Sequence, residues 1–380
     1  MLKLSGKRVI SDIKQLTPER LTEIFKKKGI ISDGKVTNIL KKSSQQTTTS
    51  NVHFLELEYF KDTQTELISL EIAVKLTRST GSVKLLGKLE VEFYNIIAET
   101  MNKMPIPICY DAAFSRITGW GHKILENLSQ THETISLPLN VYLPPQRRYC
   151  EMAIDTLAEL HAFWWDHQKL KAFSKHAHVL YTYKENSFNE KSIIAWFNNQ
   201  KIRLKQLLNL LGDRIGKKTK EMLTIIFLKF PQVANARLKK ENLTVIHGDA
   251  HFWQFFYPKN IDDVKCKAIL SDWMMWSVGV GGQDLAYMIG MFLFPKNRHM
   301  MEKELIKRYH NNLVKFGVNN FSWDECWYDY RLFNLLNIYR VVWWWSVVSY
   351  TLDYPFWWGT FNTAMLNIED LNCMELLEGK

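Results

Sequence analysis

The sequence has few of the residues that define small cross-linked or zinc-bound domains. Its 380 residues include five cysteines, 17 glycines and 10 prolines. The cysteines are odd in number, lie far apart and form no C-x-x-C pair (positions 109, 150, 266, 326 and 373). This pattern excludes a disulfide framework and a thiolate zinc site. It is typical of a reducing compartment, so we expect a cytoplasmic protein.

Long apolar runs are also lacking. Residues 1–14 contain no apolar segment of the kind found in secretory signals, so none is expected. The most membrane-like stretch, residues 341–358, contains Asp353 and Pro355 and is rich in tryptophan. A membrane-spanning helix needs about 20 mostly apolar residues without such interruptions. We therefore interpret this stretch as a buried helix and expect no membrane span.

Apolar and basic residues are abundant. Hydrophobic residues make up 46% of the chain, which excludes intrinsic disorder. There are 49 lysines and arginines against 39 acidic residues, a formal net charge of +10. This balance would suit a nucleic-acid partner, but the basic residues are spread through helical segments such as 201–205 and 217–220, without a stripe of interleaved aromatic residues. We expect a solvated basic surface and no nucleic-acid partner.

The first third of the chain is β-rich and the remainder is mainly helical. A helix is predicted to begin at Thr17, and another covers residues 88–101. A wholly polar turn without glycine is predicted at residues 43–50. Strand-type runs precede and follow that turn, and helical patterns dominate after Pro145 except for a strand-rich island at residues 243–273. At about 150 residues per domain, this length favours two or three domains or one two-lobed unit.

The island contains the residues with the clearest chemical potential. Two apolar strands each end close to an aspartate, at Asp249 and Asp272, and Gln254 follows the first. One carboxylate of such a pair can accept a proton from a hydroxyl. The other can hold Mg²⁺ that bridges nucleotide phosphates, with help from an amide oxygen.

These residues resemble a known family. His247-Gly248-Asp249, followed by an amide five positions after the aspartate, resembles the H-G-D-x-x-x-x-N motif of the aminoglycoside phosphotransferase and choline kinase-like superfamily. Residues 269–273 resemble its hydrophobic–Asp–Trp metal motif, and residues 281–286 resemble its G-x-x-D-L-A motif. The wording H-G-D-A-H-F-W is most similar to bacterial ecdysteroid kinase-like phosphotransferases.

The first third of the chain carries matching features. Lys75 ends an apolar strand, and Glu90 lies 15 residues later in an E-V-E-F-Y segment similar to the family's E-V-x-F-Y. In such kinases the strand lysine contacts the α- and β-phosphates and the helix glutamate holds that lysine. Glu90 is preferred over Glu92 by the motif's register. Residues 124–128 resemble the family's L-E-D-L hinge between the lobes.

The resemblance implies a two-lobed, protein kinase-like α+β fold. Residues 1–126 would form a nucleotide-binding lobe with a small antiparallel β-sheet. Residues 127–380 would form a large, mainly helical lobe that binds the acceptor and carries the catalytic residue. The backbone of the hinge, at Glu126 and Leu128, would pair with adenine.

The implied function is an ATP-dependent phosphotransferase acting on a hydroxyl group of a small molecule. Asp249 would accept the proton, and Asp272 would hold Mg²⁺ together with Gln254. The protein would be a monomer or a homodimer. Aromatic residues near the C-terminus could line the acceptor site, although their helical spacing fits core packing equally well (Trp343–Trp345, Tyr350, Trp357 and Trp358).

Two departures from the family pattern leave an alternative open. Gln254 stands where the motif has asparagine, and its longer side chain moves the amide oxygen by one methylene, which matters for octahedral Mg²⁺. The turn at residues 43–50 has no glycine, so hydroxyls of residues 47–50 would have to replace close backbone approach to phosphate. The alternative is a catalytically impaired, nucleotide-binding pseudokinase.

Two further interpretations concern single residues. His247, Asp249 and His251 alternate as in some metal hydrolases, but no further ligand completes such a site nearby. Asp284 is expected to be structural, as a cap for the helix that begins there.

Overall fold

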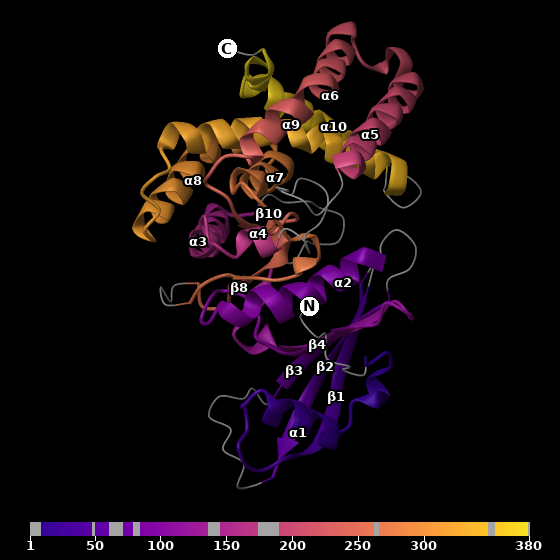
Figure 1. Ribbon diagram of the computed structural model, residues 1–380, viewed down its shortest axis with the longest axis vertical. Coiled ribbons are helices and arrows are strands. Elements are labelled where there is room, and N and C mark those ends of the chain that lie inside the picture. Colours follow the sequence, from indigo (N-terminus) through magenta and orange to yellow (C-terminus); the bar gives the residue numbers. More distant parts are fainter. Residues whose placement is uncertain are drawn as a thin grey trace. The chain divides into compact units, whose positions relative to one another are not determined.

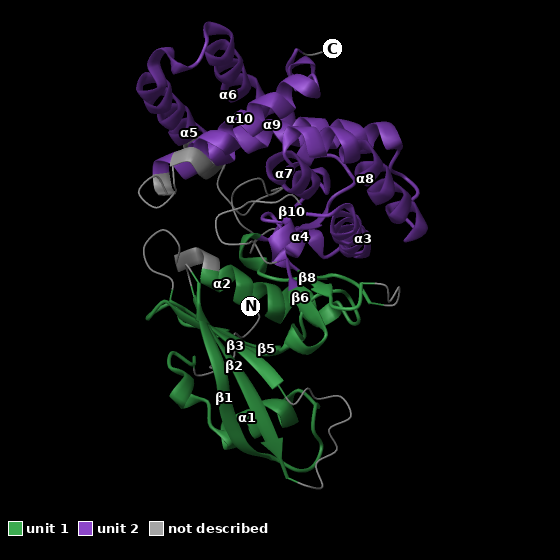
Figure 2. Ribbon diagram, turned by 180° about the vertical axis from the view of Figure 1, so that it is seen from behind, with its two compact units in different colours: residues 1–133, 256–275 green, residues 134–255, 276–380 purple. Residues whose placement is uncertain are grey.

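The computed structural model describes residues 9–47, 50–60, 71–78, 84–135, 145–173, 190–261, 266–348 and 354–378. The chain divides into two compact units (Figure 2). Unit 1 comprises residues 1–133 and 256–275, and unit 2 comprises residues 134–255 and 276–380. The shorter segment of unit 1 is therefore separated from the longer one by more than a hundred residues of unit 2.

A five-stranded antiparallel sheet forms the centre of unit 1. Its strand order is β1-β2-β3-β5-β4, and its strands are β1 (Val36–Gln46), β2 (Ser50–Tyr59), β3 (Glu71–Arg78), β4 (Cys109–Phe114) and β5 (Trp120–Glu126). Side chains alternate between the faces of a strand. On β3, Ile72, Val74 and Leu76 accordingly belong to one buried cluster, while Lys75 lies on the opposite face.

Helix α1 (Pro18–Lys27) supplies the other side of that cluster. The Thr17 side chain accepts a hydrogen bond from the Arg20 N–H, so the predicted helix start is confirmed. Leu21 and Phe25 are buried in the cluster, and the Phe25 ring meets Tyr110 edge-on at 5.2 Å between centroids. This packing fixes one face of the sheet and leaves the other for α2.

Helix α2 (Lys84–Glu92) lies on the face that carries Lys75. A π-helical segment (Phe93–Ile97) and a 3-10 turn (Ala98–Thr100) continue it, so the helix predicted for residues 88–101 begins earlier and changes its hydrogen bonding after Glu92. The Phe93 ring stacks on Trp273 with centroids 4.0 Å apart. The two segments of unit 1 thus share one core.

The polar turn predicted for residues 43–50 is wrong for residues 43–46. These residues extend β1, with Ser43 opposite Phe54 and Gln46 opposite Asn51. The turn itself is closed by Thr47, whose Oγ1 lies 2.8 Å from Ser50 Oγ; residues 48 and 49 lie outside the described residues. The side chains of residues 43–46 are all exposed, so they show none of the apolar alternation that identifies a strand.

A second, small sheet attaches the shorter segment to the rest of unit 1. It joins β6 (His132–Thr134), β8 (Phe255–Pro258) and β9 (Ile269–Leu270). The Leu270 N–H also donates to the Pro105 carbonyl at 2.9 Å. Asp272, two residues after β9, is thereby placed in unit 1.

Unit 2 is mainly helical (Figure 1). Its helices are α3 (Arg147–Trp164), α4 (Leu170–Phe173), α5 (Glu190–Leu211), α6 (Lys217–Leu238), α7 (Gly282–Phe292), α8 (Pro295–Lys315), α9 (Trp323–Val348) and α10 (Tyr354–Asp370). Strand β7 (Thr244–Ile246) pairs with β10 (Ser277–Gly279) and leads into the His247-Gly248-Asp249 loop. Helix α7 is buried almost throughout and packs against α9.

The tryptophan-rich stretch is part of this helical core. Val341, Val342 and Trp357 are buried, but Trp343–Trp345 and Trp358 are only half-buried. The stretch is divided between α9 and α10, and residues 349–353 lie outside the described part, so the interpretation of one buried helix is confirmed only in part. Among the described helices, none combines the length and apolar character needed to cross a membrane.

Candidate functional site

Three of the expected site residues meet on one face of the unit 1 sheet. Lys75 Nζ lies 2.9 Å from Glu90 Oε1 and 2.6 Å from Asp272 Oδ1. The lysine comes from β3, the glutamate from α2 and the aspartate from the turn after β9. The Lys75 side chain is 12% exposed and Asp272 29% exposed, so the cluster is partly accessible.

A second lysine, which was not predicted from the sequence, completes this cluster. Lys123 on β5 lies directly opposite Lys75 on β3. Its Nζ is 2.6 Å from Glu90 Oε2 and 3.0 Å from Thr77 Oγ1, and its side chain is fully buried. Each oxygen of Glu90 therefore binds one ammonium group. A sequence signal did exist, because Lys123 lies three residues before Glu126 of the expected hinge, on the strand that leads into it.

The two lysines have opposite pKa shifts. Burial acts to lower the pKa of Lys75, but attraction to Asp272 and Glu90 outweighs it, so the pKa lies above the ordinary value. Burial dominates at Lys123, where it outweighs Glu90 and is reinforced by the charge of Lys75, so that pKa is lowered. Lys75 is the firmly charged member of the pair.

Asp272 is oriented by an unusual backbone conformation. Its φ is +64°, in the left-handed region that aspartate tolerates better than most residues. The next residue, Trp273, is anchored by its stack on Phe93 and by an indole N–H donated to the Leu270 carbonyl at 3.0 Å. The anchored tryptophan holds the turn that presents the Asp272 carboxylate to Lys75.

The expected hinge follows β5. The Glu126 carboxylate accepts the Ile108 N–H at 2.8 Å, and the Glu126 N–H donates to the Ile108 carbonyl. Burial raises the pKa of Glu126. Leu128 begins a short 3-10 turn that the Asn127 side chain caps. The Glu126 side chain therefore stabilises the hinge.

The His247-Gly248-Asp249 loop is held by a buried carboxylate of unit 2. The His247 and Gly248 N–H groups donate to the two oxygens of Asp284 at 2.7 and 2.8 Å. Gly248 has φ +81°, which requires glycine at this position. His247 Nδ1 in turn accepts the Asp249 N–H at 3.2 Å. Asp284 is structural, as expected, but the expected capping role is wrong, because Gly281 is the N-cap and Asp284 binds the loop.

Asp284 remains ionised in spite of complete burial. Burial acts to raise its pKa, but contacts with His161 and the donated N–H groups outweigh it, so the pKa lies below the ordinary value. His161 Nε2 lies 3.3 Å from Asp284, and His161 Nδ1 lies 2.8 Å from the Tyr309 hydroxyl. The buried network of Tyr309, His161 and Asp284 therefore holds the His247-Gly248-Asp249 loop in place.

Both oxygens of Asp249 accept hydrogen bonds. The Tyr287 hydroxyl donates to Oδ1 at 2.8 Å and the Gln254 amide donates to Oδ2 at 3.0 Å. The Arg340 guanidinium lies 4.0 Å from the centre of the Tyr287 ring and donates to the Gly248 carbonyl. Tyr287 was not predicted from the sequence, although it follows Asp284 by three residues and so shares a helix face with it.

Aromatic side chains gather beside Asp249. Phe292 lies 5.0 Å from Tyr287 and 5.6 Å from Trp253, between ring centroids. Of the expected lining residues, Trp344 lies 6.4 Å from Tyr287. Trp357 is instead buried core, with its indole N–H donated to the Val341 carbonyl, and Tyr350 lies outside the described residues.

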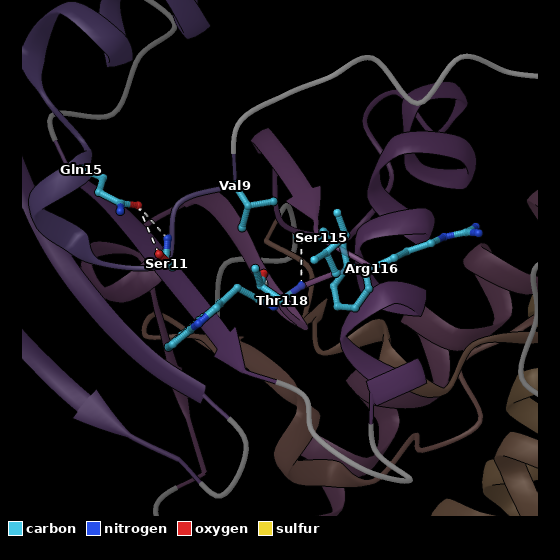
Figure 3. A pocket seen from close by; sticks show the side chains of 9 residues that line it. Val9, Ser11, Gln15, Ser115, Arg116 and Thr118 are labelled. Atoms are coloured by element: carbon cyan, nitrogen blue, oxygen red, sulfur yellow. Dashed lines mark hydrogen bonds between the residues drawn. The ribbon is translucent and has the colours of Figure 1, made fainter.

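Two observations bear on other kinds of site. A cavity of about 560 Å³ lies beside the β4–β5 turn of unit 1, but none of the expected site residues lines it (Figure 3). Within the described part of the chain, no group of three or more His, Cys, Asp or Glu is arranged to hold a metal ion. His251 Nε2 is 4.0 Å from Asp249, and the geometry gives the metal-hydrolase interpretation no support.

Comparison with known proteins identifies the family. Residues 92–318, more than half of the chain, match the ecdysteroid kinase-like family. Among solved structures, choline kinase from Cryptosporidium parvum is similar with a TM-score of 0.54 at 13% identity, covering 94% of this chain and 97% of its own. Ethanolamine kinase from Plasmodium vivax has a TM-score of 0.50 at 11% identity, covering 87% and 81%. Comparison with curated protein sequences finds no match.

These similarities confirm the expected kinase-like α+β fold, with its small antiparallel sheet and large helical part. The family match also confirms the similarity to ecdysteroid kinase-like phosphotransferases that the motifs indicated. The chain belongs to the ecdysteroid kinase-like family.

Proposed function

We propose that the protein is an ATP-dependent phosphotransferase that phosphorylates a hydroxyl group of a small molecule. The observation that carries this proposal is the bonding of Lys75 to both Glu90 and Asp272 in unit 1. A lysine held by a helix glutamate is the arrangement that kinases use to steady nucleotide phosphates. The raised pKa of Lys75 keeps its charge available for that task.

The nucleotide would bind to the first lobe, which we place at residues 1–126. Lys75 would contact phosphate oxygens, Glu90 would hold Lys75, and Lys123 would keep Glu90 in place. The hinge backbone at Glu126 and Leu128 would pair with adenine. Residues 127–380 would supply the acceptor site and the catalytic aspartate. A cytoplasmic location and a monomeric or homodimeric state stay predictions.

The donor set fits Mg²⁺. Asp272 offers a partly exposed carboxylate, and Mg²⁺ is usually held by one or two carboxylates together with substrate phosphates. Asp272 and Gln254 would hold the ion, which would neutralise charge on the phosphates. Lys75 would then exchange its bond to Asp272 for bonds to phosphate while keeping Glu90.

Asp249 would act as the base. An oxygen of its carboxylate would accept the proton of the acceptor hydroxyl as the oxygen of that hydroxyl attacks the γ-phosphorus and the bond to ADP breaks. Tyr287 and Gln254 would orient the carboxylate, since each donates to one of its oxygens. Each carboxylate oxygen has two lone pairs, so these bonds leave acceptor capacity for the substrate.

One observation favours a second candidate, a nucleotide-binding pseudokinase. The Gln254 amide nitrogen donates to Asp249, so the side chain expected to ligate Mg²⁺ contacts the expected base. If that bond keeps the amide oxygen turned away from the ion when nucleotide is bound, Asp272 alone holds the metal. Binding of ATP would then survive without efficient transfer.

The test is ADP formation by the purified chain with Mg-ATP and a panel of alcohols: choline, ethanolamine and an ecdysteroid. We expect transfer to at least one acceptor. In Asp249→Asn, turnover should fall by about a hundredfold or more with ATP affinity unchanged, because the base is lost while the nucleotide site is not. ATP affinity is measured separately by calorimetry, so a folding defect is distinguished from a catalytic one.

The variant Gln254→Asn separates the two candidates. If the wild-type protein binds ATP but transfers phosphate to none of the acceptors, and the asparagine variant does transfer, the pseudokinase is correct and our proposal is rejected. If zinc copurifies and nucleotide-independent hydrolysis is lost on chelation, both candidates fail in favour of a metal hydrolase.

A further inference from the structure

The net charge of the protein is concentrated in one helical hairpin. Between residues 201 and 240 there are eleven lysines and arginines and two acidic residues, a net charge of nine out of the formal +10 of the whole chain. This segment comprises the second half of α5 and all of α6, two helices that lie side by side in unit 2 (Figure 1). In the remaining 340 residues, basic and acidic side chains nearly balance, with a net charge of +1.

Most of this charge is not neutralised. Lys201, Lys205, Lys229, Lys239 and Lys240 are exposed and form no ion pair with any described residue. Lys217 and Lys218 have acidic partners, but their side chains are 91% and 81% exposed, and pairs that exposed are weak. Arg237 is the exception, since it is buried against Asp329.

Aliphatic side chains are exposed among these lysines. Leu228 is 65% exposed, Ile202 58%, Leu210 54% and Ile225 38%. The inner faces of both helices already bury Leu204, Leu207, Leu223 and Phe227. The exposed four therefore lie outside the buried interior of the hairpin. Ile225 and Leu228 share one helix face with Lys229 next to them, which makes that face both apolar and basic.

We infer that this hairpin, residues 201–240 of α5 and α6, is a peripheral docking surface for an anionic lipid bilayer. Clusters of four to eight basic residues on an amphipathic helix bind acidic headgroups, and neighbouring aliphatic side chains insert at the boundary with the acyl chains. Charge complementarity identifies the partner. Nucleic acid fits less well, because the described surface of the hairpin exposes aliphatic side chains and no aromatic one on which bases stack.

The inference is tested with the full chain and vesicles. Flotation compares vesicles of phosphatidylcholine alone with vesicles containing about 30% phosphatidylserine, at low and high salt. We expect binding only to the anionic vesicles, with affinity that falls as salt screens the headgroup contacts. The inference is independent of phosphotransfer, because binding is measured without nucleotide or acceptor.

Two variants locate the surface. The triple variant Lys217→Gln/Lys218→Gln/Lys229→Gln removes three hairpin charges, and we expect about a hundredfold weaker binding. Its matched control, Lys296→Gln/Lys303→Gln/Lys315→Gln, removes three exposed charges from α8. We expect this control to bind the anionic vesicles as tightly as the wild-type chain.

The double variant Ile225→Ser/Leu228→Ser keeps the charge of the hairpin and is expected to weaken binding at least tenfold. Met300→Ser/Val314→Ser on α8 is its control.

Several results would overturn the inference. Absence of vesicle binding by the wild-type chain rejects it directly. Equal losses in the hairpin and α8 variants show that net charge, and not this surface, is responsible. Tighter binding of a DNA or RNA oligonucleotide, with competition against vesicles, assigns the surface to nucleic acid.

Discussion

Asp249 is held on both sides by neutral donors. Tyr287 binds one oxygen and Gln254 binds the other, and Arg340 covers the Tyr287 ring. Two fixed donors restrict the carboxylate to one orientation. For a general base this restriction has catalytic value, since proton transfer depends on the position of the accepting oxygen.

The variant Tyr287→Phe tests this positioning role. We expect kcat to fall about tenfold with the KM for ATP unchanged, because the carboxylate loses its orientation while the nucleotide half is untouched.

Tyr330→Phe provides the control. It removes another buried tyrosine hydroxyl of unit 2, one that donates to Glu302 away from the loop. A similar kcat loss in both variants would reduce Tyr287 to a purely structural residue.

At the residue scale, the sequence predicted the site residues that belong to motifs and missed those that are identified only by contacts in the fold. Lys75 and Glu90 follow from a strand, a helix and a spacing, and they do meet. Lys123 was missed because a lysine in a short strand is normally solvated; only the pairing of β3 with β5 places it against Glu90. Tyr287 was missed because its partner Asp249 lies 38 residues earlier in the chain.

At the scale of elements, α7 holds the loop that carries the base. Asp284 accepts two consecutive backbone N–H groups of that loop while fully buried. We expect Asp284→Asn to lower the free energy of unfolding by about 3 kcal/mol at neutral pH, because an asparagine nitrogen would face one of the N–H donors.

The effect of Asp284→Asn should depend on pH in a defined way. The pKa of Asp284 is lowered in the folded protein, so its stabilising contribution is present above the unfolded-state pKa and is lost only as pH falls through the folded value. Urea unfolding of both proteins should give a constant difference from about pH 5 to 8 that narrows only below about pH 4. A difference that already narrows between about pH 7 and 5 would contradict a lowered pKa of Asp284 in the folded protein.

Strand β1 shows why an element can escape prediction. Its second half is exposed on both faces at the edge of the sheet, so its polar residues carry no apolar alternation. Pairing with β2 alone determines that they are extended. In contrast, the start of α1 was predictable from Thr17 and Pro18, because an N-cap threonine followed by proline favours a helix start without long-range contacts.

At the scale of the whole molecule, two buried tryptophans three residues apart belong to different units. Trp273 lies in unit 1 and Trp276 in unit 2. We expect Trp273→Ala to accelerate amide hydrogen exchange in α2 and β3, because Phe93, in the π-helical segment that continues α2, loses its stacking partner. Trp276→Ala, a substitution of equal size, should instead accelerate exchange in unit 2.

Hydrogen exchange with mass spectrometry distinguishes the two patterns peptide by peptide. Acceleration in both units by either variant would show that they unfold as one cooperative body. If each variant accelerates exchange only in its own unit, residues 256–275 are energetically part of unit 1.

The whole-molecule features were predicted unevenly. The fold class was predicted from three motifs, at residues 247–254, 269–273 and 281–286, because few other folds carry these motifs in this order. The basic segments 201–205 and 217–220 looked dispersed along the chain. They form one hairpin, since α5 and α6 lie side by side only after folding. Charge clustering in space depends on helix pairing, which sequence spacing does not encode.

The divided construction of unit 1 also affects how the protein is made. The ribosome completes residues 1–133 first, but Asp272 and Trp273 follow only after the 138 residues 134–271 have been added. At typical elongation rates this interval is roughly 7 to 28 s. During that time Lys75 and Lys123 share Glu90 alone, and the Phe93 ring lacks its stacking partner. The nascent protein therefore acquires its balanced charge cluster late in translation.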